Sequence, residues 1–485
     1  MIHGGPRYLE FDWNTTRLSC EDAGHIVRIA RHLVHRVLFL LPVLPGDRNN
    51  IERMETAMEV YDRFQPLKLA HPHVRLSALE ARTLEPGLTD RLVGAVTMEE
   101  WGVDPHRLAW ANVEDAIEHG AAAENHAAVT GLQRQEGRIA GVRYRSGGVE
   151  KHVRARVVVN AAGPWAGQVA RLAGVEIALR PAKGIHIVYD RRLSNFALSA
   201  EAVDGRSLLL IPHGAFTLLG TTDDDYYGDL DAVEVLPDEV DYLLQAFERV
   251  MPGISAHRAV RATTGVRPTL FKWRPYEDDL SRRYEVIDHG VRDGVAGLVS
   301  VVGGKLSMYR RMAEDSADAV CEQLGVVARS TTADKPLPGG AAAPPPAEEV
   351  GRRHGVSAAV AARLLRRHGD QSEAVLGATP GPRVVCRCEG VTDAELRYAC
   401  RREQAAGVAD AFRRVGLGAG PCAGSACVDR ASEVVGDELG WSSRQQREAA
   451  LAFLRAMWVG RAPVLGPDGW AQEELAYGGK WGYRL

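Results

Sequence analysis

The sequence predicts a mixed α/β (α+β) protein with a small cysteine-containing module towards its C-terminus. Three observations support this fold class. Two short β-branched runs, at residues 156–166 and 298–302, are typical of buried strands of a parallel sheet. Two further stretches, at residues 139–155 and 207–223, have the pattern of β-hairpins. Four cysteines are grouped in two short loops between residues 386 and 427.

The composition is that of an ordinary globular protein and excludes several functions. A chain of 485 residues with 45% hydrophobic and 25% charged residues can bury more than one core, so we expect two to four domains. The net charge is −4, and the 52 Arg and 7 Lys are scattered, which gives no support for nucleic-acid binding. The longest apolar stretch, residues 37–44, is interrupted by Pro42 and is far shorter than the ~20 residues of a membrane-spanning helix. No signal peptide is recognisable at the start, so we expect a cytoplasmic protein without structural disulfides.

The elements of the N-terminal half are predicted in chain order. Mixed polar and apolar spacing at residues 21–36 and 51–63 suits surface helices. Residues 139–155 form a hairpin around the turn at Ser146, Gly147 and Gly148. The buried strand at 156–166 follows at once, and the second hairpin turns at residues 213–215.

The second buried strand leads into a glycine turn and a helix. Gly303 and Gly304 close the strand at residues 298–302, and the following helix ends at Gly325, which is a suitable C-cap. This arrangement presents free backbone N–H groups and the positive end of a helix to a negative or polarisable partner.

A linker separates the large domain from the C-terminal region. Residues 337–348 are rich in Pro, Gly and Ala, which is typical of linkers. A short helical segment follows, and the cysteine module begins near Arg383.

The cysteine module carries the strongest chemical signal. Cys386 and Cys388 form a C-x-C pair, Cys422 and Cys427 form a C-x4-C pair, and thirty-three residues lie between the pairs. Four thiolates from two short loops suit a [2Fe–2S] cluster, with a structural zinc ion or no metal as the alternatives. Thr392 is predicted to cap the next helix, with Glu395 completing a capping box. The other three cysteines, Cys20, Cys321 and Cys400, are interpreted as simple thiols.

Four basic residues of the large domain lie in apolar or glycine-bearing sequence. A guanidinium in such surroundings needs an anionic partner, and its fork suits phosphate or carboxylate. Each one alone is more often part of a structural ion pair, but four together suggest an anion site: Arg7, Arg267, Arg282 and Lys305.

Two other polar features have an ordinary explanation. His186 lies on a predicted strand, where a single histidine is usually a hydrogen-bonded core residue. The acidic run at residues 223–225 is expected to be a solvated turn.

Taken together, these segments resemble the FAD-dependent glycerol-3-phosphate dehydrogenases. With the cysteine module included, the chain is most similar to the A subunits of the anaerobic type. The matching segments are IHGGPRYLE, VVNAAGPWA, AKGIHIV, LLGTTDDDYYGD, TGVRP, SRRY and GGKLSMYR.

The resemblance implies a two-layer flavoprotein of the amino-acid-oxidase type, in which an incomplete Rossmann-like layer holds FAD. The implied dehydrogenase domain covers residues 1–328, with its substrate sheet mainly at 181–291. A linker at 329–348 and a helical segment at 349–382 lead to a ferredoxin-like [2Fe–2S] domain at 383–435 and a tail at 436–485. The implied reaction oxidises sn-glycerol 3-phosphate to dihydroxyacetone phosphate by hydride transfer to FAD, and electrons then pass through the cluster to quinone.

The resemblance also assigns roles to individual residues. His186 is the candidate catalytic base, and Arg267 is a catalytic residue that contacts the substrate or its phosphate. The residues implied to bind the substrate are Arg7, Tyr8, Arg282 and Lys305. The residues implied to contact FAD are His3, Gly4, Gly5, Gly163, Gly303, Gly304 and Lys305.

One feature departs from the family pattern. Family members begin with a strand and a G-x-G-x-x-G turn that cradles the FAD pyrophosphate, and no such unit occurs in this sequence. We expect that the start was assigned too late or that the sequence is a fragment. Two alternatives remain: an amine or amino-acid dehydrogenase of the same fold, and a non-catalytic iron–sulfur remnant.

The partners are implied by the family and not by the residues themselves. They are glycerol 3-phosphate, electron-transfer subunits and membrane quinone, with the chain cytoplasmic or peripheral at the inner face of the membrane. The amphipathic stretch at residues 446–458 is expected to pack internally, with a docking face as the alternative.

Overall fold

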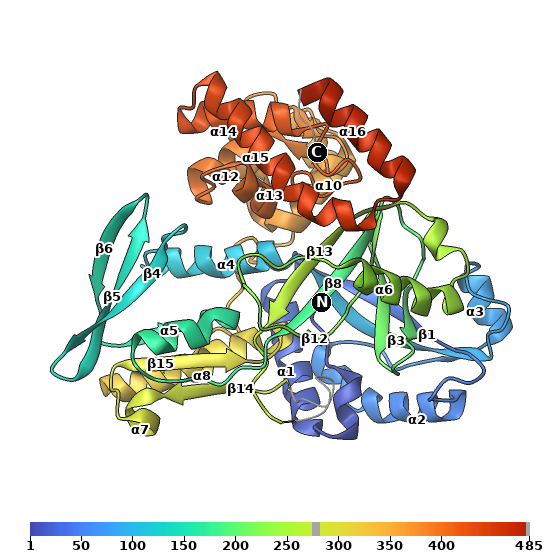
Figure 1. The fold of residues 1–485 in the computed structure, drawn as a ribbon, viewed down its shortest axis with the longest axis horizontal. Coiled ribbons are helices and arrows are strands. Elements are labelled where there is room, and N and C mark those ends of the chain that lie inside the picture. The colour runs from blue at the N-terminus through green and yellow to red at the C-terminus, as the bar shows by residue number, and fades with distance from the viewer. Residues whose placement is uncertain (274–281, 482–485) are drawn as a thin grey trace.

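The largest element of the computed structural model, which describes residues 1–273 and 282–481, is a mixed β-sheet. Among these residues it has nine strands, in the order β12-β8-β11-β10-β9-β1-β3-β2, with β13 also paired to β8. The strands are β1 (Val34–Val43), β2 (Arg75–Ser77), β3 (Gly94–Val103), β8 (Ala182–Tyr189), β9 (Ala197–Glu201), β10 (Ser207–His213), β11 (Phe216–Gly220), β12 (Asp224–Asp225) and β13 (Ala259–Arg267). Helix α6 (Pro237–Val250) packs on this sheet and buries Leu243 and Phe247 in its core (Figure 1).

The second layer is a three-stranded sheet of β14 (Tyr284–Asp288), β15 (Leu298–Gly303) and β7 (Val158–Asn160). Strand β15 runs parallel to β7, with Leu298 opposite Val158, and β14 is antiparallel to β15. The two strands predicted to belong to a parallel sheet are therefore direct neighbours. Helices α5 (Ala166–Leu172) and α8 (Tyr309–Leu324) flank this sheet, as Figure 1 shows. Gly325 ends α8 with a φ of 65°, which confirms the predicted C-cap.

Both predicted hairpins are confirmed. Strands β5 (Arg138–Ser146) and β6 (Val149–Arg154) pair antiparallel, and β4 (Ala128–Gln135) adds a third strand. Strands β10 and β11 form the second hairpin within the large sheet.

The N-terminal helices agree only in part with the sequence. Helix α2 (Ile51–Asp62) matches its prediction, but the surface helix predicted at residues 21–36 is wrong. The observed helix, α1 (Trp13–Ile29), starts earlier because the Asp12 side chain accepts a hydrogen bond from the Thr15 N–H. The helix also ends earlier than predicted, because β1 begins at Val34 and pairs with β3. Most residues of α1 from 19 to 29 are buried, so it is not a surface helix.

Helices dominate the C-terminal region. They are α9 (Ala347–His354), α10 (Ala358–His368), α11 (Ser372–Leu376), α12 (Asp393–Arg402), α13 (Val408–Val415), α14 (Val428–Leu439), α15 (Ser443–Arg461) and α16 (Pro467–Trp481). The short strands β16 (Val384–Cys386) and β17 (Val391–Thr392) precede α12. Thr392 caps α12 as predicted, but the predicted capping box is wrong, because the Glu395 carboxylate contacts Arg363 (2.7 Å) and His368 instead. The predicted linker is partly fixed to the large domain, since the Leu337 N–H donates to the Ile29 carbonyl (2.8 Å).

The C-terminal helices lie against β13 and α4 (Pro105–Glu118) (Figure 1). At β13, Arg261 Nη1 donates to the carbonyl of Gly418, beside the cysteine loop (3.3 Å). Gly460 of α15 approaches the same strand so closely that a Cβ there would lie 2.3 Å from the Ala262 carbonyl oxygen. At α4, the buried Arg107 contacts Glu403 through Nη1 (2.6 Å). Polar and close-packed contacts together therefore fix the C-terminal region on the large sheet.

The remaining helices of the large domain are short: α3 (Ala78–Leu84) and α7 (His289–Asp293). A search of the described residues finds no helix with the length and apolar character needed to cross a membrane.

Candidate active site and cysteine cluster

Strand β8 holds His186 between β11 and β13, opposite Gly220 and Thr263. Gly220 makes room for the imidazole, since a Cβ there would lie 2.6 Å from the ring carbon Cδ2. Burial, and then the nearby charge of Arg267, lowers the pKa of His186 to about 4. The ring is therefore neutral at pH 7 and able to accept a proton.

Arg267 ends β13 and reaches back over β8. Its Nη1 donates to Asp223 Oδ1 (2.9 Å), and its Nη2 donates to Thr221 Oγ1 (3.0 Å). The guanidinium crosses Gly184, where a Cβ would lie 2.6 Å from both terminal nitrogens. Gly184 was not predicted to matter, and its small size is what admits the arginine at this place.

Asp223 joins two of the predicted substrate-binding arginines. Arg282 donates to Asp223 Oδ2 while Arg267 occupies Oδ1, so one carboxylate contacts both guanidiniums. Asp223 is only 7% exposed, which corrects the prediction of a solvated acidic turn. The two acids that follow it are also paired, Asp224 with Arg206 and Asp225 with Arg180.

The N-terminal segment brings the remaining predicted residues to the same region. Arg7 and Tyr8 lie in the 3-10 helix η1 (Pro6–Glu10), with the Arg7 guanidinium 5.0 Å from the centre of the Tyr8 ring. Lys305 Nζ lies 4.8 Å from the same ring centre and donates to the carbonyls of His3 (3.3 Å) and Gly4 (3.1 Å).

Among the described residues, the charges of this group lower the pKa values of several of its members. Burial, together with the charges of Arg7 and Lys68, lowers the pKa of Lys305 to about 7. Burial and Lys305 also bring the pKa of His3 well below its usual value. The pKa of Arg267 is lowered by burial, and by Arg282 and Arg7, against the opposing effect of Asp223. Such a site favours the binding of an anion.

The glycines predicted to contact FAD lie at the ends of the parallel strands. Gly303 and Gly304 have φ values of 80° and 83°, and a Cβ on Gly303 would lie 2.5 Å from the Arg283 carbonyl oxygen. They lead into the 3-10 helix η6 (Leu306–Met308) and then α8. Gly163 follows β7 with a φ of 55°, and the space beside it is open. Because β7 and β15 are parallel, both turns lie at the same edge of the sheet.

The structure thus gathers His186, Arg267 and Arg282 with the η1 residues and Lys305, and places the glycines on the second layer. It also adds residues that were not predicted to belong to the site, namely Thr221, Asp223 and Gly184. The buried side chains of Glu100, Lys68 and Tyr61 lie next to Gly4 and were not predicted either. The sequence signal for Asp223 was its place directly after a hairpin that ends in Gly220 and Thr221.

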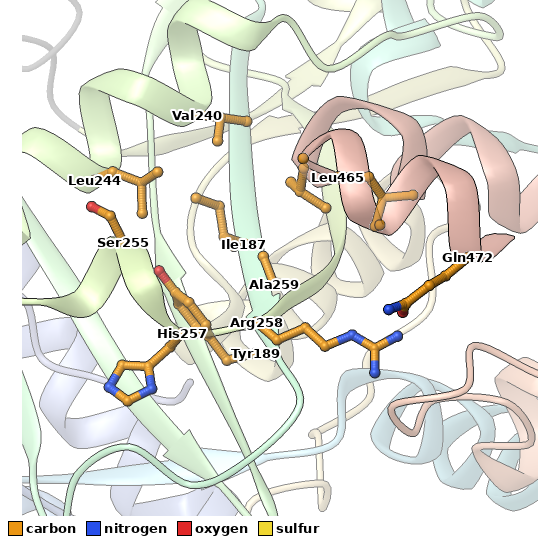
Figure 2. Close-up of a pocket in the computed structure, with 13 residues that line it drawn as sticks. Ile187, Tyr189, Val240, Leu244, Ser255, His257, Arg258, Ala259, Leu465 and Gln472 are labelled. Atoms are coloured by element: carbon orange, nitrogen blue, oxygen red, sulfur yellow. The ribbon is translucent and has the colours of Figure 1, made fainter.

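A separate cavity of about 330 Å³ lies on the other face of the large sheet. Ile187 and Tyr189 of β8 line it, together with α6 and the segment between α15 and α16 (Figure 2). Side chains alternate along a strand, so these residues point away from the face that carries His186. The cavity is therefore separated from the candidate active site by the thickness of the sheet.

The four predicted cysteines converge at the start of α14. The Cys427 thiol lies within hydrogen-bonding reach of the thiols of Cys386 and Cys422, and Cys422 is within reach of Cys388. Gly420 makes this possible, since a Cβ there would lie 2.4 Å from the Cys388 Cβ. Hydrogen bonding from Cys427 lowers the pKa of Cys386 to about 6 and that of Cys422 to about 5.

As they stand, the side chains of the described residues do not form a ready metal site. Within residues 1–273 and 282–481, no group of three or more His, Cys, Asp or Glu residues has a geometry that could hold a metal ion. The thiols are gathered, but the cluster predicted from their spacing stays a prediction.

Two family models match the chain and divide it in the same order as the structure. The model described as FAD-dependent oxidoreductase matches residues 1–306. The model described as the C-terminal domain of α-glycerophosphate oxidase matches residues 330–446. The fold and the first match together define a flavin-dependent oxidoreductase.

Curated relatives specify the family further. The A subunit of the anaerobic glycerol-3-phosphate dehydrogenase from Escherichia coli K12 is 34% identical over 490 residues, covering 100% of this chain and 88% of that protein. The A1 subunit of the anaerobic enzyme from Haloferax volcanii is 33% identical over 427 residues, covering 82% of this chain and 69% of that protein. The chain belongs to the family of FAD-dependent glycerol-3-phosphate dehydrogenases.

Solved structures agree at the level of the fold. The glycerol-3-phosphate dehydrogenase from Bacillus halodurans, complexed with FAD, superposes with a TM-score of 0.73 at 24% identity and covers 92% of this chain and 86% of its own. The glycine oxidase from Geobacillus kaustophilus has a TM-score of 0.50 at 19% identity, covering 69% of this chain and 86% of its own.

Proposed function

We propose that this chain oxidises sn-glycerol 3-phosphate to dihydroxyacetone phosphate and sends the electrons through a [2Fe–2S] cluster at its four cysteines towards membrane quinone. The observation that carries the proposal is the placement of a neutral histidine beside clustered guanidiniums on one face of the sheet. When bound, FAD supplies the hydride acceptor and the cluster a carrier of single electrons.

The residues at the strand ends fit a flavin. Gly303 and Gly304 adopt backbone conformations that favour glycine, and α8 and its 3-10 turn start directly behind them. Together with the open space at Gly163, this edge offers backbone N–H groups to an anionic or polarisable ring.

The residues of the other layer fit the substrate. Arg267 and Arg282 bind the phosphate in competition with Asp223, and Arg7 and Lys305 add positive charge. His186 takes the proton of the C2 hydroxyl as a hydride leaves C2, so that C2 becomes a carbonyl carbon and the imidazole becomes protonated. Burial, and then the charge of Arg267, keeps the pKa of His186 low, so the base is unprotonated before the reaction.

The cysteines fit a cluster by their convergence. Two loops bring four thiols together, and the backbone N–H groups of Gly418, Glu389, Gly424 and Ala426 donate to Cys386 and Cys422. Donors of this kind stabilise thiolates, which is the form that binds iron or zinc. Electron-transfer subunits would receive the electrons, and we propose a cytoplasmic or peripheral location for the chain.

The test is an absorption spectrum of the full chain, purified without oxygen, with flavin, iron and zinc quantified. We expect flavin and iron together, and bleaching of the flavin bands by glycerol 3-phosphate. Flavin that is reduced by an amino acid and not by glycerol 3-phosphate would support the amino-acid dehydrogenase instead. Iron without flavin would support a non-catalytic iron–sulfur remnant. Zinc in place of iron would show that the four cysteines form a structural zinc site and not a [2Fe–2S] cluster.

A matched pair of variants separates the two centres. Cys422→Ser should remove the cluster bands and leave substrate-dependent flavin bleaching intact. Cys400→Ser, which removes a half-buried thiol outside the four, should change neither.

A further inference from the structure

A fully buried ionic group lies beneath the N-terminal segment of the candidate active site. Lys68, at the end of the 3-10 helix η2 (Gln65–Lys68), pairs with Glu100 of β3 at 2.5 Å, and their side chains are 0% and 1% exposed. Tyr61 of α2 donates to the other Glu100 oxygen (2.5 Å), and Lys68 Nζ also donates to the Glu99 carbonyl (2.7 Å). The polar groups of these three side chains are therefore hydrogen-bonded to one another and to the Glu99 carbonyl.

Stability alone is a weak reason for such a group. Taking a lysine and a glutamate out of water is costly, and replacing a buried ion pair by apolar residues is often neutral or stabilising. A buried triad of this kind is better explained by what it holds in place.

The triad holds the His3–Gly5 backbone. The Gly4 N–H donates to Glu100 Oε2 (3.4 Å), and a Cβ on Gly4 would lie 2.2 Å from the Tyr61 hydroxyl. The Ile2 and Trp101 backbones exchange hydrogen bonds (2.8 and 3.2 Å), and the Trp101 indole donates to the Lys68 carbonyl (2.8 Å). The segment thus contacts the triad directly at Gly4, and the Ile2 backbone is linked to it through Trp101.

Lys305 holds the same segment from the opposite side. Its ammonium group has three N–H donors, and the carbonyls of His3 and Gly4 accept two hydrogen bonds from it. The Gly4 peptide is therefore fixed between Glu100 and Lys305. A change at Glu100 is therefore expected to alter the position of Lys305 through this peptide.

We propose that Glu100, Lys68 and Tyr61 are positioning residues of the candidate active site, which fix the His3–Gly5 backbone and through it the place and charge of Lys305. The inference rests on the proposed function, since it gives Lys305 the task of binding an anionic substrate.

The charges around Lys305 come from several elements. The Cys20 thiol on α1 would favour the protonated form of Lys305 only as a thiolate, and burial raises the pKa of Cys20 to about 12, so the thiol is uncharged near pH 7. Glu100 on β3 favours the protonated form, while Arg7 on η1 and Lys68 on η2 oppose it. His3 also faces it. Glu100 is thus the carboxylate that offsets the burial of the ammonium group in this set.

Glu100→Gln is the first test, because it keeps the shape and removes the charge. Glu239→Gln is the matched control: it breaks the buried Lys183–Glu239 pair (2.7 Å), which does not contact the His3–Gly5 segment. The Lys305 amine is titrated by NMR in full chain labelled at lysine Cε, where seven lysines give few signals and Lys305→Arg assigns the one of interest.

We expect Glu100→Gln to lower the Lys305 midpoint by about one pH unit or more, as loss of a neighbouring opposite charge does. We also expect it to raise KM for glycerol 3-phosphate about tenfold near neutral pH, with the control unchanged in both. Tyr61→Phe keeps the ion pair and serves if Glu100→Gln does not fold; it should raise KM by a smaller factor.

An unchanged Lys305 midpoint and unchanged KM in a folded Glu100→Gln would overturn the inference. Equal effects of Glu100→Gln and Glu239→Gln would do the same, since they would mark a general loss of stability. A wild-type chain that does not oxidise glycerol 3-phosphate would refute the proposed function, but the Lys305 titration would still decide the positioning role.

Discussion

Two buried ionic clusters of this molecule differ in how their charges are matched. Where the C-terminal helices meet the large domain, each guanidinium has its own carboxylate: Arg107 with Glu403 (2.6 Å), Arg363 with Glu395 (2.7 Å) and Arg367 with Asp104 (2.5 Å). At the candidate active site, Arg267 and Arg282 share Asp223, and Lys305 and Arg7 lie close by.

The difference indicates what each cluster is for. A cluster in which each guanidinium has its own carboxylate leaves no charge unmatched among these pairs, and it serves to join parts of the chain. A cluster in which two guanidiniums share one carboxylate costs free energy when empty and regains it when an anion binds. The balance of charge, and not the mere presence of buried arginines, distinguishes a binding site from an interface.

The largest effect is expected at His186. His186→Asn should lower kcat by about 10²–10⁴-fold, as loss of a general base does, and leave phosphate affinity nearly unchanged. Steady-state kinetics with glycerol 3-phosphate measures this. His257→Asn, an exposed residue at the cavity on the opposite face, is the control and should match the wild type.

The pH dependence follows from the same residue. The folded pKa of His186, about 4, is below its ordinary value of 6.5, so the unfolded chain takes up a proton first as the pH falls. Its contribution to stability should therefore be lost between about pH 6.5 and pH 4 and stay constant below that. Thermal unfolding of wild type and His186→Asn across this range should show the smaller acid loss in the variant.

The matched cluster should respond in stability. Glu403→Ala leaves the buried Arg107 without its carboxylate, which typically costs about 3–5 kcal/mol. Denaturant unfolding of the full chain measures the loss, and Glu433→Ala, which breaks the exposed Arg430–Glu433 pair, should change stability little. Equal losses in the two variants would contradict the assigned role of the interface.

Replacement of arginine by lysine should affect KM at one cluster and Tm at the other. Arg267→Lys removes the fork that suits phosphate and should raise KM about tenfold to a hundredfold, with little change in Tm. Arg107→Lys should do the reverse and lower Tm without changing KM. A KM effect at Arg107 equal to that at Arg267 would remove the distinction between the two clusters.

A smaller effect is expected at Gly184. Gly184→Ala places a methyl group against the Arg267 guanidinium, and overpacking of this kind typically costs about 1–3 kcal/mol. We expect KM to rise several-fold, with kcat changed less. Gly466→Ala is the control, because Gly466 has open space beside it, has no positive φ and lies at the cavity on the opposite face of the sheet.

The sequence predicted those elements whose signals are local. The strands at 158–160 and 298–303 were recognisable because β-branched runs end in small residues, and both hairpins because turn residues separate apolar runs. Residues 274–281, part of the implied substrate sheet at 181–291, lie outside the described residues.

The failures involve contacts between residues distant in sequence. Glu395 has the spacing of a capping-box residue, yet Arg363 and His368 of another helix offer it stronger partners. Asp223 looks like part of a solvated acidic turn, but Arg267 at the end of β13 and Arg282 just before β14 both contact its carboxylate. Lys68 and Glu100 are thirty-two residues apart and carry no local sign that they are buried together.

Strand β13 fixes a length within the molecule. Arg261 near its start touches the cysteine loop, and Arg267 at its end lies in the candidate active site. Six residues of extended chain span about 20 Å, and a strand hydrogen-bonded to its neighbour cannot stretch. The number of residues in β13 therefore sets the distance between the cysteine loop and the candidate active site. Deletion of one residue between Arg261 and Arg267 would shorten that distance by about 3.3 Å and turn Arg267 to the opposite face of the sheet.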